Sequence, residues 1–180
     1  MRRAELEHLL RAASQISGER DILVIGSQSI LGSLPEDELP SEATGSIEAD
    51  VAFFGPDGEA KADLVDGAIG ELSPFHQQFG YYAQGVSVTT AILPKGWRDR
   101  LVPLTSPGTE PGRGLCLDPH DCVIAKLLAG RDKDLHFADS LVRAALIDPT
   151  VLAERLTAVH DAHPIAIERT RTWIQHRLHR

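Results

Sequence analysis

The spacing of apolar residues changes once along this chain, near Leu117, and this change restricts the fold more than any other feature. Before it, short runs rich in β-branched residues alternate with turns and helical patterns; after it, only the spacing typical of helices continues. We therefore expect an α+β fold with a mixed sheet over residues 1–117. Residues 118–180 are expected to form a helical region packed on that core. A chain of 180 residues buries enough apolar surface to fold as this single compact unit without a disulfide or metal.

The predicted elements of the first part alternate in type. They are a helix at 3–17, a strand at 21–25, a short helix at 28–34, a loop at 35–46, a strand at 47–54, a helix at 61–72, two strands joined at a bend within 81–93, an edge strand at 101–104 and a strand at 115–117. The second part is predicted to hold helices at about 119–129, 132–146, 150–160 and 164–178. Asp118-Pro119 supports the first of these, since Asp is a favoured N-cap and Pro suits the first helical position.

The charge of the chain is unevenly distributed. Its net charge is −8, and residues 1–60 hold 12 acidic and 4 basic residues, whereas the remainder is balanced. Contacts to nucleic-acid phosphates need Lys and Arg, so this balance argues against a dedicated DNA-binding module. It is compatible with an acidic metal site beside a locally basic surface.

The sequence also bears on location. No apolar run approaches ~20 residues, so no membrane span is expected. The first residues, MRRAELEHLL, lack the apolar stretch of a secretory signal. Cys116 and Cys122 are therefore predicted to be reduced thiols of a cytoplasmic protein.

The strongest chemical signal is a short strand that leads directly into Gly26-Ser27 and a helix, followed by Glu48-Ala49-Asp50 within the next strand. Alternation along a strand places Glu48 and Asp50 on one face, with Cα atoms ~6.6 Å apart. Two such carboxylates repel one another unless a cation lies between them, and a divalent ion with oxygen ligands fits that need. Gly26-Ser27, at a strand-to-helix turn, offers backbone N–H groups and a hydroxyl to a phosphate. The plainer alternative is a solvated strand face.

This order of motifs resembles the G-[GS]…[DE]-x-[DE] signature of the DNA polymerase β-like nucleotidyltransferase superfamily. The stretch GSQSILGSLPEDELPSEATGSIEADVAFF is similar to a small bacterial branch that resembles the AbiEii-like nucleotidyltransferases, which act as toxins in toxin–antitoxin systems. The likeness continues through SPFHQQFGYYAQGV, LPKGWRDRL and LDPHDCVIAKLLAGRDKDLHF, and so covers roughly residues 20–145.

The resemblance implies a nucleotidyltransferase-type fold and a Mg²⁺- or Mn²⁺-dependent transfer of NMP from an NTP to an acceptor. The acceptor is an RNA such as tRNA, a protein or a small molecule, and a toxin would have an antitoxin partner. Glu48 and Asp50 would hold the metal. A lysine and a later aspartate of that family map to Lys126 and Asp134, with Asp132 as the second choice. The implied nucleotide-binding residues are Gly26, Ser27, Lys126 and Arg131. The alternative for the segment around Lys126 is a charged surface cluster between two helices.

Two departures from the superfamily keep an alternative function open. Residues 85–93, the expected place of a third metal-binding carboxylate, contain no acidic residue, and the first acid is Glu48 where Asp is common. The alternative is a catalytically degenerate nucleotidyltransferase fold that serves as a binding or regulatory module. A further alternative is a structural protein whose Glu48 and Asp50 face solvent.

Two other segments each have two interpretations. Tyr81 and Tyr82 either line a substrate pocket and stack on a base or pack as ordinary aromatic residues. Residues 95–100 (KGWRDR) form a basic loop that either contacts an acceptor or lies on the surface with its Trp partly packed.

Overall fold

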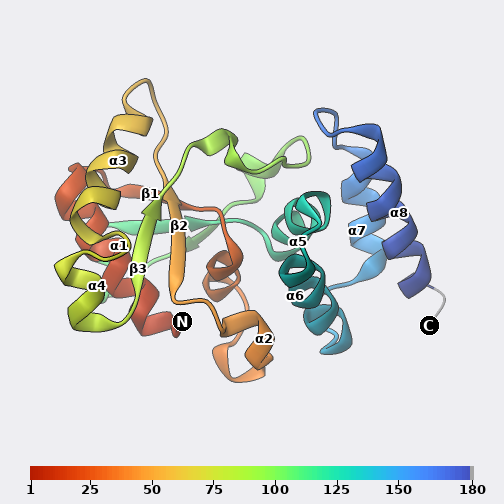
Figure 1. The fold of residues 1–180 in the computed structure, drawn as a ribbon, viewed down its shortest axis with the longest axis horizontal. Helices are drawn as coiled ribbons and strands as arrows, with labels where there is room; N and C mark the ends of the chain where they lie inside the picture. Colours follow the sequence, from red (N-terminus) through yellow and green to blue (C-terminus); the bar gives the residue numbers. More distant parts are fainter. Residues whose placement is uncertain (179–180) are drawn as a thin grey trace.

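A five-stranded mixed sheet crosses the middle of the protein, and helices cover both of its faces (Figure 1). The computed structural model describes residues 1–178. The strands lie in the order β3-β2-β1-β5-β4; β1 is parallel to β5 and β2 to β3, whereas the β1–β2 and β4–β5 pairs are antiparallel. Their bounds are β1 Asp21–Val24, β2 Glu48–Ala52, β3 Tyr82–Gly85, β4 Val102–Leu104 and β5 Arg113–Cys116. The predicted α+β class with a mixed sheet is confirmed.

The helices fall into two groups on opposite sides of the sheet (Figure 1). The first group consists of α1 Arg3–Ser17, α3 Gly58–Ile69 and α4 Pro74–Phe79. The second consists of α5 Pro119–Ala129, α6 Asp132–Arg143, α7 Pro149–Thr157 and α8 Pro164–Leu178, with the short α2 Ser41–Thr44 against α6. Short 3₁₀ helices are η1 Ser27–Gly32, η2 Glu36–Glu38, η3 Val88–Thr90 and η4 Trp97–Arg100.

Alternation along the central strands divides the apolar residues into two cores. On β1, Ile22 is buried on the side of α1 and α3, and Leu23 is buried on the side of α5 to α8. On β2, Ala49 is buried in the core on the side of α1 and α3. Glu48 and Asp50 therefore point to the other side, toward the helical region.

α1 forms because its apolar residues fall on one face. Leu6, Leu9, Leu10 and Ala13 are fully buried, and each leucine contributes about 1.5–3 kcal/mol by leaving water. The helix ends at Gly18, whose φ of 72° is a left-handed conformation that glycine adopts without strain. The predicted bounds 3–17 are confirmed.

α5 carries the N-cap expected from its sequence. The Asp118 side chain accepts hydrogen bonds from the backbone N–H groups of His120 and Asp121, and Pro119 occupies the first turn. Gly130 ends the helix with a φ of 68°, and α6 begins two residues later. The predicted helix 119–129 is confirmed.

The prediction of two strands within residues 81–93 was wrong. Only β3 forms there, as an edge strand, and the chain then turns into η3. The Ser87 hydroxyl accepts a hydrogen bond from the Thr89 N–H and so stabilises this turn. The β-branched residues that suggested a second strand pack on the helical core instead: Val86 and Val88 contact it from the loop.

Residues 35–46, predicted to be a loop, contain η2 and α2. Pro35 and Pro40 immediately precede these turns, with φ of −60° and −64°. Proline presets the backbone for the start of a helical turn, which explains two short helices in a polar segment.

The helix predicted at 61–72 lies three residues earlier, because the Lys61 N–H bonds to the Asp57 carbonyl and closes the first turn of α3. α4 was not predicted. It begins where the Ser73 hydroxyl accepts a bond from the His76 N–H.

Among residues 1–178, no helix has the length and apolar character required to cross a membrane. The apolar core on the other side of the sheet from α1 and α3 contains residues of β1, β2 and the helices α5 to α8. The division at residue 117 into a core and a helical region remains a prediction.

Candidate active site

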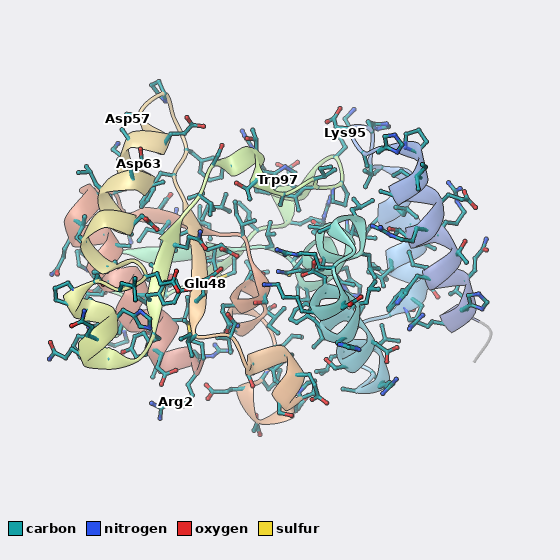
Figure 2. The ribbon with its side chains drawn as sticks, in the orientation of Figure 1. Arg2, Glu48, Asp57, Asp63, Lys95 and Trp97 are labelled. Atoms are coloured by element: carbon teal, nitrogen blue, oxygen red, sulfur yellow. The ribbon has the colours of Figure 1, made fainter. Side chains whose placement is uncertain are left out.

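A cleft of about 520 Å³ opens between β2, α2 and the junction of α5 with α6. Glu48, labelled in Figure 2, lies in its wall. Most residues proposed from the sequence line it together: Ser27, Glu48, Asp50, Lys126, Arg131 and Asp134. Residues far apart in the chain thus converge on one place.

The two carboxylates of β2 share one face, as the strand periodicity predicts. Burial raises the pKa of Asp50 to about 6, and the negative charge of Glu48 adds to this; Lys126 and Arg131 oppose it. The positive charges of the protein thus do not fully stabilise the ionised form of Asp50. A bound cation would stabilise it further.

Gly26 is needed for the position of Asp50. A Cβ atom at Gly26 would lie 1.8 Å from Asp50 Oδ2, far closer than any real contact. Gly26 is not among the residues that line the cleft, whereas Ser27 is. Its lack of a side chain therefore makes room for a carboxylate, a role that sequence reasoning missed.

Ser27 is supported by the next residue. The Gln28 side-chain amide donates to Ser27 Oγ at 3.3 Å, which leaves the Ser27 hydroxyl proton free to donate into the cleft. Gln28 itself is buried, and no local sequence pattern predicted this contact.

Lys126 and Asp134 meet across the α5–α6 junction. Lys126 Nζ lies 3.5 Å from Asp134 Oδ1, and Arg131 Nε donates to Asp134 Oδ2 at 2.7 Å. Burial alone would raise the pKa of Asp134, but its hydrogen bonds with Arg131 and the charge of Lys126 hold it below the usual value. Asp134 is thus an ionised carboxylate that orients two cations.

The structure separates the two aspartates considered for this position. Asp134 is 2% exposed and lines the cleft, whereas Asp132 is exposed and lies outside its wall. The tight Gly130 turn brings α6 against α5. Arg169 from α8 secures that turn by donating to the carbonyls of Leu127 and Leu128.

β3 supplies two side chains that sequence reasoning did not place beside the carboxylates. Tyr82 pairs with Glu48 in the parallel register and donates its hydroxyl proton to Glu48 Oε2 at 2.8 Å. Burial, and then the bond to Glu48, raises the pKa of Tyr82. Gln84 pairs with Asp50 and also lines the cleft. Alternation along residues 82–84 predicts that both side chains share one face, but their place beside the carboxylates depends on the pairing of β3 with β2.

Tyr82 is buried, bonds to Glu48 and is not among the residues that line the cleft, which fits the alternative in which it packs as an ordinary aromatic residue. Tyr81 lies elsewhere, in an aromatic cluster with His8, Phe75 and Phe79, and its hydroxyl contacts His8 Nδ1 at 2.8 Å.

The donor set fits a small divalent cation. Glu48 and Asp50 offer carboxylate oxygens, the ligands that Mg²⁺ and Mn²⁺ prefer. Within residues 1–178, no group of three or more acidic, His or Cys side chains forms a fuller metal cluster. A metal held here would take its other ligands from water or a substrate phosphate.

Comparison with known proteins gives one result of substance. A family model described as "Nucleotidyltransferase of unknown function (DUF6036)" matches residues 4–174. Neither the curated proteins nor the solved structures yield a match.

Proposed function

Because the chain belongs to the DUF6036 family of nucleotidyltransferases, we propose that it is a Mg²⁺- or Mn²⁺-dependent enzyme that transfers NMP from an NTP to an acceptor hydroxyl. One observation carries the proposal: the two carboxylates of β2 and the cations of α5 and α6 line the same cleft. Carboxylates bind a divalent metal and cationic side chains bind a triphosphate. The cleft therefore holds both kinds of group that nucleotidyl transfer requires.

Glu48 and Asp50 would hold the divalent ion, with Tyr82 fixing one oxygen of Glu48. When bound, the ion neutralises charge on the phosphate oxygens of the NTP. Metal binding would also require Asp50 to be ionised, which its raised pKa of about 6 still allows at neutral pH.

The phosphates would be bound by the remaining groups of the cleft. Ser27 donates its free hydroxyl proton, and Lys126 acts as a point charge held in place by Asp134. Arg131, held by the same carboxylate, adds a second cation.

In the transfer, the acceptor oxygen forms a bond to the α-phosphorus of the NTP. The bond from that phosphorus to the bridging oxygen breaks, and pyrophosphate leaves with the electron pair. The acceptor's proton passes to water. The residues of this chain align the α-phosphate and stabilise the charge on the leaving group, which is the main contribution of a protein to such reactions.

Calorimetry with each of the four NTPs, with and without Mg²⁺, tests the binding step. Incubation of bulk RNA and protein with each α-labelled NTP tests the transfer. We expect metal-dependent binding and labelling that Glu48→Ala and Asp50→Ala abolish and Asp132→Asn leaves intact. Wild-type protein that neither binds an NTP nor labels any acceptor would overturn the proposal.

A second candidate is a degenerate nucleotidyltransferase fold that binds a nucleotide without transferring it. It is favoured by the lack of a third carboxylate: residues 85–93 contain no acidic residue, and Gln84, which pairs with Asp50, is an amide. This candidate predicts metal-dependent NTP binding without labelling of any acceptor.

Three finer points belong to the same proposal. The acceptor is an RNA such as tRNA, a protein or a small molecule; the enzyme acts as a toxin with an antitoxin partner; and it works in the cytoplasm. The resemblance to AbiEii-like enzymes supports the first two, and the free thiols Cys116 and Cys122 support the third. Growth arrest on expression, relieved by Asp50→Ala, would be the expected sign of a toxin.

A further inference from the structure

A second hollow, of about 270 Å³, adjoins the cleft, and we propose that it is a subsite for a nucleobase. Val86 lines both spaces. The other lining residues include Phe54, Val88 and Arg98, together with the polar side chains of Ser87 and Glu59. The inference rests on the proposed function and adds a place for the base of the substrate.

The hollow continues along the strand that carries the carboxylates. Phe54 follows the end of β2 and, like Glu48 and Asp50, lies on the side of the sheet that faces the helical region. Its ring packs against the apolar core of that side. Phe54 lies two residues beyond the end of β2, and four residues of chain span at most ~13 Å, so an elongated ligand anchored at Asp50 would reach Phe54.

Phe54 and Arg98 line the hollow, and both lie close to the ring of Trp97. The Arg98 guanidinium carbon lies 5.1 Å from the centre of the Phe54 ring and 5.4 Å from that of Trp97. The two rings are 6.2 Å apart with planes at 28°. Within residues 1–178, Arg98 has no carboxylate within 4.0 Å, so its charge is uncompensated by an ion pair. Aromatic rings and arginine planes are the surfaces on which bases stack.

The segment that carries Trp97 and Arg98 is fixed to the helical region (Figure 2 labels Lys95 and Trp97). Arg100 binds the fully buried Asp121 of α5 through two hydrogen bonds, of 2.8 and 3.1 Å. The Lys95 N–H donates to the Ala158 carbonyl, just after α7, at 2.8 Å. Anchoring on both sides holds the backbone beside Arg98 in place, which lowers the entropic cost of ordering this segment around a ligand.

The size and edges of the hollow suit one base rather than a whole nucleotide. Its volume lies just below the ~300–1,000 Å³ typical of complete ligand sites. Val86, Val88 and Phe54 contact an apolar ring face, and the side chains of Ser87 and Glu59 provide hydrogen-bonding groups for its edge. A base can come from the NTP itself or from a single-stranded RNA acceptor.

Fluorescence of Trp97 tests the proposal, because the chain has two tryptophans and Trp173→Phe leaves Trp97 as the sole reporter. In that background the protein is titrated, with Mg²⁺, against each NTP, a short single-stranded RNA and inorganic tripolyphosphate. We expect an NTP or the RNA to change the emission, and tripolyphosphate to bind in calorimetry without that change. Arg98→Ala should weaken binding of the base-containing ligand roughly tenfold. Binding of tripolyphosphate should be unaffected, and Arg171→Ala on α8 serves as the charge-matched control.

The titrations also separate the sources of the base. A response to an NTP alone assigns the subsite to the nucleotide donor, and a response to the RNA alone assigns it to the acceptor. Calorimetric NTP binding that depends on Asp50 but not on Arg98, without any change in Trp97 emission, overturns the subsite and leaves the proposed function standing. The absence of any binding by NTP and RNA overturns both.

Discussion

At the scale of single residues, the cleft depends on the close approach of Gly26 to Asp50. We predict that Gly26→Ala moves the Asp50 carboxylate, because the new Cβ would lie 1.8 Å from Oδ2. Mg²⁺ binding should be lost at a stability cost of about 1–2 kcal/mol, the usual effect of overpacking. Calorimetry and urea unfolding measure the two effects.

The control is Gly67→Ala. A Cβ at Gly67, within α3, would meet nothing within 4 Å, and alanine favours helix over glycine by about 0.8–1 kcal/mol. This variant should be more stable than wild type with unchanged metal binding. Normal Mg²⁺ binding by Gly26→Ala would contradict the role of Gly26.

Asp50 gives a prediction about pH. Its pKa is about 6 in the folded protein against an ordinary 3.8, so between these values the folded state binds a proton more tightly than the unfolded state. Protonated Asp50 therefore stabilises the metal-free folded protein at low pH. This stabilisation, up to about 3 kcal/mol in the free energy of unfolding, is lost as the pH rises from about 4 to 6. Asp50→Asn should remove that loss and be more stable than wild type at pH 7.5, but should not bind Mg²⁺.

Urea unfolding of both proteins at pH 5 and pH 7.5, without metal, measures the effect. If the free energy of unfolding changes with pH by the same amount in wild type and in Asp50→Asn, Asp50 is not the titrating group. A stabilised but inactive variant is typical of a site where function opposes stability.

The Tyr82 hydroxyl is predicted to orient Glu48 for metal binding. Tyr82→Phe removes the 2.8 Å bond to Glu48 Oε2 and should weaken Mg²⁺ binding several-fold, with a stability loss of about 1 kcal/mol. Tyr81→Phe is a matched control, since it removes an equivalent bond, to His8. Equal metal affinity in the two variants would mean that Tyr82 has a purely structural role.

At the scale of elements, α5 and α6 present cations of different burial to the same cleft. Lys126 is 17% exposed and held by Asp134, while Lys133 is exposed. Lys126→Ala should therefore weaken NTP binding about tenfold or more, since an ordered, partly desolvated cation binds phosphate strongly. Lys133→Ala should weaken it less than about threefold. Calorimetry measures the NTP affinity of both variants. Equal losses of affinity would indicate that NTP binding depends only on the net charge of the cleft.

The elements also show what sequence alone could predict. Helices α1 and α5 were placed to the residue, because apolar spacing, Asp118 and the two glycine ends determine them locally. The facing of Glu48 and Asp50 followed from strand alternation. Residues 86–90 could not be placed, since Val86 and Val88 are partly buried against the helical core without a partner strand, which no local pattern distinguishes from a strand. The contacts of Gly26 with Asp50 and of Tyr82 with Glu48 depend on strand pairing that no local pattern encodes.

At the scale of the whole molecule, the proposed site lies on one side of the sheet and at one end of the helical region. We predict that binding of an NTP with Mg²⁺ slows amide hydrogen exchange in η1, β2 and the α5–α6 junction, because these line the cleft. α1, on the opposite face of the sheet, should change little. Mass-spectrometric exchange measures this, and protection centred on α1 would place the ligand elsewhere.

The β1–β5 pairing has a consequence for synthesis on the ribosome. β1 emerges early, but one of its edges stays open until residues 113–116 arrive to pair with it. Lys126 and Asp134 follow later still, so a nascent or prematurely terminated chain would hold the two carboxylates without their cations. If the proposed function holds, activity would arise only after most of the chain has been translated, and truncated products would be inert.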